Sequence, residues 1–442
     1  MSEERKLEYA SRLQRMIRIE TVSDPGRRSP EEDFDRFRGL LQELFPALFA
    51  ACVQEDAGGS ILLRWRGDVS SALPVMFMNH FDVVPADGKG WTFPPFSGEI
   101  DGERLWGRGT LDDKGGVWAM MQAAEELAEE GFVPPRDIYF EIGCDEEIRG
   151  HNADAISARF HDQGKRFEMV FDEGGDIVRD PISGAKGLFA MVGVGEKSVV
   201  ELKFTARSEG GHASTPDKDT PFVRLGKFMA YVDRHQIFDV EISPVVSEML
   251  TRLSPYMKGG GKLLGKAGKA KKPIEMLKPK LGGTVGALLS TTIAFTMAGG
   301  GEAVNVIPKE AWAIADMRCS HHQGQDASIA AVTRIAKRFG LETEVITRSV
   351  SSDITDHGCR AFKLVEEAVA AVLPEVDACV PYLMTGGSDS RYFGRVCDQC
   401  IRFLPFVLEA GQLSSIHGVD EYVGLDSLEP AVDYYKYLIK NV

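Results

Sequence analysis

Residues 74–85, PVMFMNHFDVVP, join an apolar run to a histidine and an aspartate. The run Pro74–Met78 is wholly apolar, as expected of a buried strand. Side chains two positions apart on a strand point to the same side, so His80 and Asp82 would lie together where this strand ends. A metal-bound imidazole usually needs a carboxylate or carbonyl to hold its other nitrogen. The pair is therefore either a metal ligand with its orienting partner or a polar cap on a turn.

Strands and helices alternate around this stretch. Strand-like segments occur at 60–65, 137–144 and 167–171, and helix-like segments at 3–20, 33–50, 114–130 and 153–163. Such alternation predicts an α/β domain, with a mixed, mostly parallel sheet and helices on both of its faces.

The pattern changes near residue 190. Residues 198–206 alternate like a half-exposed strand, and the segments that follow read as helix, strand, strand and helix at 221–233, 290–296, 311–317 and 327–339. This predicts a smaller α+β domain with an antiparallel sheet over residues 191–350. The helix expected at 360–373 resumes the α/β character, so residues 1–190 and 351–442 would form one discontinuous domain.

The composition excludes some partners. The net charge of −15 disfavours nucleic acid and anionic membranes. The polar N-terminal stretch does not read as a signal segment, and no run approaches the roughly 18 to 20 apolar residues of a membrane span. Seven scattered cysteines, an odd number, suggest reduced thiols and a cytoplasmic location. Residues 258–280 hold eight Lys and five Gly, either a solvated loop or a basic hairpin that touches lipid or acidic substrate.

Acidic and histidine residues gather where the predicted strands end. Besides His80 and Asp82, they include Asp112 and Asp113 just before a helix, Asp145–Glu147 and Asp172–Glu173 after strands, and His417 far downstream. In open α/β sheets, ligands bind at the carboxyl ends of the strands. Crowded carboxylates are unfavourable unless cations neutralise them. Two His with several Asp and Glu suit zinc, and a shared carboxylate suits a two-metal site.

These motifs, in this order, resemble one family. The matching stretches are 78–85, 90–98, 107–116, 145–147, 210–214, 305–308, 386–391 and 416–418. The chain resembles the two-zinc metallopeptidases of the aminoacylase and carboxypeptidase group, and within it the carboxypeptidase S and N-fatty-acyl-amino-acid hydrolase branch. The resemblance implies a catalytic domain at 1–190 and 351–442, and a lid and dimerisation domain at 191–350.

The resemblance also implies which residues bind metal. His80 would be a ligand of one zinc, oriented by Asp82, and Asp112 would bridge both metals. Glu147 and His417 would hold the second zinc.

The remaining ligand of the first zinc would be Asp172 or Glu173. Adjacent residues of a strand point opposite ways, so one of the two is expected to bind. In this branch of the family the aspartate fits best. Co²⁺ and Mn²⁺ accept such ligands as well as Zn²⁺.

The catalytic roles follow from the same resemblance. Glu146 would be the general base that takes a proton from a metal-bound water, whose pKa the metal lowers towards about 7. His212 would stabilise the oxyanion in a neighbouring subunit, which implies a homodimer through the smaller domain.

The resemblance points to four substrate-holding residues as well. Arg318 and Arg391 would bind a free carboxylate, with Asn305 beside the substrate and Gly387 in the pocket wall. Each arginine would instead make a structural salt bridge if it lies away from the substrate.

We therefore expect a zinc-dependent hydrolase that cleaves an amide next to a free carboxylate, in a small peptide or an N-acyl amino acid. A dipeptidase of the same family is the near alternative. A non-catalytic, metal-stabilised binding protein is the alternative from a different class.

Overall fold

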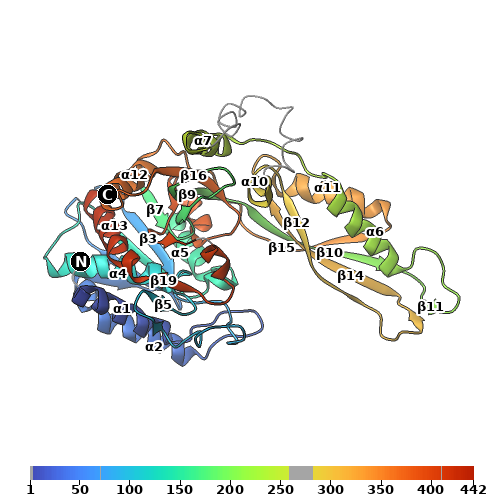
Figure 1. The fold of residues 1–442 in the computed structure, drawn as a ribbon, viewed down its shortest axis with the longest axis horizontal. Helices are drawn as coiled ribbons and strands as arrows, with labels where there is room; N and C mark the ends of the chain where they lie inside the picture. Colours follow the sequence, from blue (N-terminus) through green and yellow to red (C-terminus); the bar gives the residue numbers. More distant parts are fainter. Residues whose placement is uncertain (1–2, 70, 258–281, 410) are drawn as a thin grey trace.

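The computed structural model describes residues 3–69, 71–257, 282–409 and 411–442, and it contains two domains (Figure 1). The basic segment 258–280 lies outside the described residues. The larger domain contains both termini, and the smaller one extends away from it as a long, narrow body. Within the described residues, no helix has both the length and the apolar character needed to cross a bilayer.

The larger domain is built on a ten-stranded mixed sheet. Its strands run in the order β1 (Cys52–Glu55), β2 (Ile61–Trp65), β6 (Ile138–Gly143), β3 (Val75–His80), β7 (Met169–Asp172), β17 (Cys400–Arg402), β9 (Leu188–Glu196), β8 (Ile177–Arg179) and β18 (Val407–Leu408), with β16 (Ala378–Met384) also on β9. The central strands β6, β3, β7 and β17 pair in parallel. The predicted mixed, mostly parallel sheet is confirmed.

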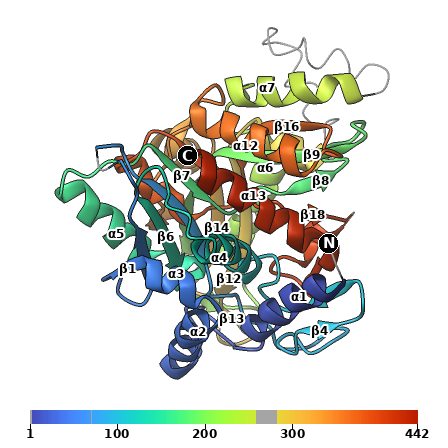
Figure 2. The ribbon, with the colours of Figure 1, turned by 90° about the vertical axis from the view of Figure 1, so that its left-hand side faces the viewer.

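Helices cover both faces of this sheet. Phe77, Phe140 and Phe171 point from the central strands into the main core. The helices packed there are α1 (Glu3–Ile17), α2 (Glu31–Leu44), α3 (Pro46–Ala51), α4 (Lys114–Glu129), α12 (Arg360–Val372) and α13 (Leu428–Asn441). Met78 and Val170 point the other way, into a smaller core under α5 (His151–Asp162) and the 3-10 helix η5 (Asp389–Arg395). Figure 2 looks onto this domain, with the smaller one behind it.

Short elements surround the sheet of the larger domain. Strands β4 (Glu99–Ile100), β5 (Arg104–Trp106) and β19 (Tyr422–Gly424) form a small separate sheet. Single 3-10 turns complete the connections, at η1 (Glu146–Ile148), η2 (Ser254–Tyr256), η6 (Gln412–Ser415) and η7 (Leu425–Ser427).

The smaller domain has a four-stranded antiparallel sheet, as expected. Its order is β12 (Thr292–Gly300), β14 (Glu310–Cys319), β10 (Ser198–Arg207) and β15 (Glu342–Arg348). Alternate residues of β14 are buried, which is the period of a strand with one covered face. That face packs on α6 (Pro221–Arg234) and α11 (Gly324–Arg338). A two-stranded ribbon of β11 (Gly211–His212) and β13 (Val306–Ile307) forms the end farthest from the larger domain (Figure 1).

The structure refines the boundary between the domains. Strand β9 belongs to the larger sheet up to Glu196, six residues beyond the expected end at 190, because Leu188–Glu196 is buried on both faces. Helix α7 (Pro244–Leu253) lies between strands of the smaller domain in sequence. Its apolar residues, such as Met249 and Leu253, nevertheless pack in the main core of the larger domain. Helix α10 (Gly282–Leu288) leads the chain back to β12.

Candidate functional site

The candidate residues lie where the central strands end. His80 ends β3, Gly143 ends β6 just before the Asp145–Glu147 stretch, and Asp172 ends β7. Because β3 pairs in parallel with both neighbours, these ends share one edge of the sheet. Helix α4 begins at the same edge. A Cβ on Gly116 would lie 2.3 Å from Oδ1 of Asn79, so glycine is what lets this helix approach β3 closely.

Asp112 joins the two predicted metal-binding histidines. Its Oδ1 lies 3.0 Å from Nε2 of His80, and its Oδ2 lies 3.0 Å from Nε2 of His417. Oε2 of Glu147 is 3.3 Å from the same nitrogen of His417. One donor atom each from His80, Asp112 and Glu147 lies within 4.8 Å of the others, close enough for a shared cation. Two imidazoles on opposite oxygens of one carboxylate are the arrangement that a bridging ligand requires.

The ionisable groups of this cluster titrate far from their ordinary pKa values, because they are buried and face one another. Hydrogen bonds to Asp112 and Glu147 raise the pKa of His417 to about 10, and those to Asp112 and Asp82 raise the pKa of His80 although burial opposes it. Burial raises the pKa of Glu147 to about 7. Burial acts in the same direction on Asp112, but hydrogen bonds from the two histidines hold its pKa well below the usual value. The donor set therefore fits divalent cations that would replace the imidazole protons.

Asp82 supports the cluster from behind. Nδ1 of His80 is 3.0 Å from the backbone oxygen of Asp82 and 3.4 Å from its carboxylate. The two carboxylate oxygens accept the backbone N–H groups of Glu146 and Glu147 at 3.1 and 3.2 Å. Asp82 thus holds the imidazole mainly through its main chain and the following acidic turn through its side chain. Asp113, which is fully buried, accepts the backbone N–H of His80 at 3.2 Å.

The choice between Asp172 and Glu173 can be examined from strand alternation. Met78 and Val170 lie in the smaller core, so the even-numbered residues His80 and Asp172 share that side of the sheet. The carboxylate of Asp172 accepts the N–H of Ser390 at 2.7 Å and that of Glu173 at 2.9 Å. Burial raises the pKa of Glu173 well above its ordinary value. The alternation favours Asp172, and its assignment as a ligand stays a prediction.

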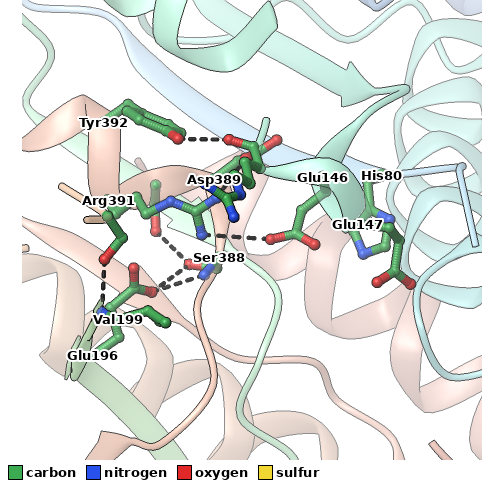
Figure 3. Close-up of polar contacts among 12 residues, drawn as sticks. His80, Glu146, Glu147, Glu196, Val199, Ser388, Asp389, Arg391 and Tyr392 are labelled. Atoms are coloured by element: carbon green, nitrogen blue, oxygen red, sulfur yellow. Dashed lines mark hydrogen bonds and ion pairs between the residues drawn. The ribbon is translucent and has the colours of Figure 1, made fainter. Parts of the chain in front are cut away.

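Glu146 points into the same space from η1. Burial raises its pKa to about 8, opposed by His80 and Arg391. Nη1 of Arg391 lies 3.6 Å from Oε1 of Glu146, and Nη2 lies 3.7 Å from the carboxylate of Asp389 (Figure 3). Arg391 is 9% exposed, and its guanidinium faces the carboxylates of Glu146 and Asp389. Gly387 adjoins it, since a Cβ there would lie 2.8 Å from Nη1.

His212 and Asn305 lie together, but far from this cluster. His212 is in β11, paired with Val306 of β13, and the backbone oxygen of Asn305 accepts the N–H of Ala213 at 3.0 Å. Both residues are exposed, at the end of the smaller domain farthest from the larger one (Figure 1). Nδ1 of His212 lies 3.2 Å from the backbone nitrogen of Ser214 and 2.7 Å from its hydroxyl.

Arg318 lies near the junction between the domains. Nε and Nη2 donate to the carboxylate of Asp316 at 2.7 and 3.1 Å, and Nη1 donates to the backbone oxygen of Thr385 at 3.4 Å. The structure therefore gives Arg318 a bidentate internal partner.

A buried ion pair that sequence reasoning missed holds the loop that carries Asp112. Glu421 accepts the N–H groups of Leu111 and Asp112 at 2.8 and 3.1 Å and forms an ion pair with Arg108. Arg108 in turn donates to the backbone oxygen of Gly418, beside His417. In the sequence, Glu421 is a single acidic residue four positions after His417, and no pattern around it reveals these backbone donors.

Known proteins resemble this chain along most of its length. A sequence model of peptidase family M20/M25/M40 matches residues 76–441. "Probable carboxypeptidase S-like 2" of Dictyostelium discoideum is 30% identical over 98% of this chain and 85% of its own. The human "N-fatty-acyl-amino acid synthase/hydrolase PM20D1" is 29% identical over 100% of this chain and 89% of its own.

Solved structures share the fold. The M20 family metallo-carboxypeptidase Sso-CP2 of Sulfolobus solfataricus superposes with a TM-score of 0.71, at 16% identity, over 98% of each chain. Because the family model matches residues 76–441 and a relative is 30% identical along nearly the whole chain, the chain belongs to peptidase family M20/M25/M40 and is an enzyme of that family.

Proposed function

We propose that this enzyme hydrolyses an amide bond next to a free carboxylate, using two divalent cations held by the cluster around Asp112. The single observation that carries the proposal is the contact of both oxygens of Asp112 with different imidazoles, at 3.0 Å each. Such a carboxylate can serve two metal ions at once.

The residues divide between two cation positions. His80, Asp112 and Asp172 would hold one ion, and Asp112, Glu147 and His417 the other, with Asp82 holding His80 in place. When bound, two Zn²⁺ ions would polarise the amide carbonyl and acidify water, and Co²⁺ or Mn²⁺ accept the same ligands. The exposed side chain of His417 leaves the second position open towards solvent.

Glu146 would move the proton. Its carboxylate adjoins the cluster, takes a proton from the attacking water and returns it to the departing nitrogen. A pKa raised to about 8 by burial favours the protonated form in the absence of metal. Nearby cations favour the ionised form that a base needs. Arg391 at 3.6 Å holds the carboxylate on the side away from Glu147.

A second copy of the chain would complete the site. His212 lies on β11 at the far end of the smaller domain, and within the described residues its side-chain hydrogen bonds involve Nδ1. We propose that it stabilises the oxyanion in a partner subunit, with Asn305 beside it, so that the enzyme works as a homodimer through the smaller domain. A preorganised donor of this kind typically contributes about 3 to 4 kcal/mol.

The substrate would carry its free carboxylate to an arginine. Arg391 and Arg318 are the candidates, and Gly387 leaves room beside the first of them. The relatives' names mention carboxypeptidase and N-fatty-acyl-amino acid chemistry, and both reactions cut an amide next to a carboxylate. We propose small peptides or N-acyl amino acids as the substrate class, with dipeptides as the near alternative.

We also propose a cytoplasmic location. All seven cysteines are free thiols, as is usual in a reducing compartment. Fractionation of cells that make the tagged protein tests this, and recovery in the secreted fraction would contradict it.

The decisive test of the function is Glu146→Gln in zinc- and cobalt-loaded protein. We expect kcat to fall by roughly 10²- to 10⁴-fold on N-acyl amino acids and dipeptides, because the base is lost. Metal content should remain at two ions per chain, measured by elemental analysis. Glu130→Gln, at an exposed position at the end of α4, is the matched control and should keep full activity. Unchanged turnover in Glu146→Gln, or no turnover by the unmodified protein on any of these substrates, would contradict the proposal.

A further inference from the structure

One buried glutamate outside the metal cluster holds a turn that reaches into it. Glu196 is the last residue of β9 and is 2% exposed. Its Oε2 accepts hydrogen bonds from the N–H of Ser388 at 2.8 Å, from the hydroxyl of Ser388 at 3.1 Å and from Nε of Arg402 at 3.2 Å (Figure 3). Arg402 is 1% exposed. Three donors converge on this one buried oxygen, which fixes its position, and loss of Arg402 would leave the carboxylate buried without its cation.

The 388–391 turn passes this constraint to the metal cluster. The N–H of Ser390 donates to Asp172 at 2.7 Å, and the hydroxyls of Ser388 and Ser390 are 3.0 Å apart. At the end of the turn, Arg391 faces Glu146 at 3.6 Å. One turn of chain thus contacts both the predicted ligand on β7 and the predicted base on η1.

The main chain of Glu196 lies at the junction of the two domains. Its N–H donates to the hydroxyl of Ser352 at 3.1 Å, and that hydroxyl donates to its backbone oxygen at 3.2 Å. Ser352 belongs to the segment by which the chain returns from β15 to the larger domain. The next residue, Lys197, donates its N–H to the backbone oxygen of Met384, at the end of β16, at 3.0 Å. Two of the segments that connect the domains, at 196–198 and at 349–355, therefore meet at this glutamate.

We propose that Glu196 is a positioning residue for the reaction: it fixes the 388–391 turn, so that Ser390 holds Asp172 and Arg391 faces Glu146. Through its main chain it also ties this geometry to the junction with the smaller domain. The inference rests on the proposed function, in which Asp172 binds metal and Glu146 is the base. It assigns a role to a residue that touches neither metal nor substrate.

The first test is Glu196→Gln, which keeps the size of the side chain and removes the charge that faces Arg402. We expect the affinity for one of the two metal ions to fall by about 10- to 100-fold, as is typical when a partner of a metal ligand is lost. The second ion, on the Glu147 and His417 side, should bind as before. Turnover should fall mainly in kcat rather than in KM. Zinc titration against a competing chelator and steady-state kinetics measure both effects.

A paired variant separates positioning from folding. Glu196→Leu with Arg402→Met removes both charges, a replacement that buried ion pairs often tolerate. It leaves the N–H of Ser388 without its acceptor. We expect a folded protein, by the thermal midpoint of the metal-free form, that shows the same loss of one metal affinity and of kcat. If this folded variant has the same metal affinities and the same kcat as the unmodified protein, the proposal is overturned. If the paired variant does not fold, Glu196→Gln decides, since it keeps the size of the side chain. Metal affinities and kcat equal to those of the unmodified protein in Glu196→Gln would likewise overturn the proposal.

Glu201→Gln is the matched control. Glu201 lies on β10 close to the junction and bridges to Arg149 at 3.1 Å, but it has no contact with the 388–391 turn among the described residues. Its metal affinities and kcat should stay within about twofold of the unmodified protein, as for other exposed ion pairs. Failure of the proposed function looks different, because the unmodified protein itself would then bind no metal pair or hydrolyse nothing. A loss in Glu201→Gln equal to that in Glu196→Gln would also overturn the assignment.

Discussion

The two ends of this molecule hold their histidines in opposite ways. At the sheet edge of the larger domain, His80 is 2% exposed, its two ring nitrogens contact Asp82 and Asp112, and its backbone N–H donates to Asp113. At the far end of the smaller domain, His212 is exposed, and within the described residues its side chain forms hydrogen bonds with Ser214, two residues away. The first histidine is fixed by distant parts of its own chain, and the second by its own ribbon.

This difference separates two properties of the enzyme. A buried cluster with complete internal support can bind cations in a single chain. An exposed histidine on a distant ribbon can contribute to catalysis only where another surface approaches it. We therefore expect metal binding to be a property of the single chain and full turnover a property of the assembly.

Removal of the cluster's metals should have the largest effect. His80→Ala, or exhaustive chelation of the unmodified protein, should reduce activity by at least about 10³-fold, because the electrostatic stabilisation of the transition state is lost. Readdition of Zn²⁺ should restore the chelated protein but not His80→Ala. Elemental analysis and turnover on N-acyl amino acids measure this. Full activity after chelation would contradict the metal-dependent mechanism.

His212→Ala should lower kcat by about 10²- to 10³-fold while both metal ions stay bound. The ribbon is exposed, so the fold should not change. A mixture then tests whether the histidine acts in a partner subunit. In a dimer of one His212→Ala chain and one Glu146→Gln chain, a single site keeps both residues.

Mixed and allowed to exchange subunits, these two inactive variants should recover about a quarter of the unmodified activity, since half of the dimers are mixed and each has one complete site. Activity after mixing, set against each variant alone, is the measurement. No recovery despite proven exchange, or a fully active monomer in sedimentation, would contradict the role of a second subunit.

The same contrast shows what sequence can reveal. The sheet edge was predictable, because apolar runs that end in His or acidic residues mark where parallel strands end. His80, Asp112 and Glu147 accordingly lie together in the structure. The supports of that edge were not predictable. Glu196 and Glu421 accept backbone N–H groups of segments far away in sequence, and Arg402 donates to the carboxylate of Glu196. A single charged residue carries no pattern that reveals such partners. Helix α7 was not among the predicted helices, although its start carries the usual signals, a serine cap followed by proline. Its packing could not be predicted, since its apolar face belongs to a core on the other side of the domain boundary.

Asp82→Ala should have a moderate effect that sharpens the comparison. The backbone oxygen that holds Nδ1 of His80 at 3.0 Å survives the change, whereas the support of Glu146 and Glu147 is lost. We expect metal affinity to fall by about 10- to 100-fold, less than in His80→Ala. Asp82→Asn, which keeps an acceptor oxygen, should have a metal affinity between that of Asp82→Ala and that of the unmodified protein. Equal losses in Asp82→Ala and His80→Ala, by chelator competition, would mean that Asp82 is itself a ligand.

The smallest expected effect is a pH-dependent stability that only the metal-free protein shows. His417 has its pKa raised to about 10, so the stability it contributes is complete below about 6.5 and is lost as the pH rises towards 10. Glu146 and Glu147, with pKa values raised to about 8 and 7, add an unfavourable contribution that grows as the pH rises from about 4.5 through those values. Asp112, with its lowered pKa, acts only at acidic pH, outside this window. The thermal midpoint of metal-free protein should therefore fall between pH 6 and pH 9, as measured by calorimetry.

Bound Zn²⁺ should flatten this dependence of the midpoint on pH, because it replaces the imidazole protons and neutralises the carboxylates. His212→Ala should leave the slope unchanged, since its exposed ring lies outside the cluster, whereas Glu147→Gln should reduce it. A midpoint of the metal-free protein that rises with pH would show that the cluster does not titrate as a buried unit. Burial of the cluster would then not be what distinguishes it electrostatically from the exposed His212.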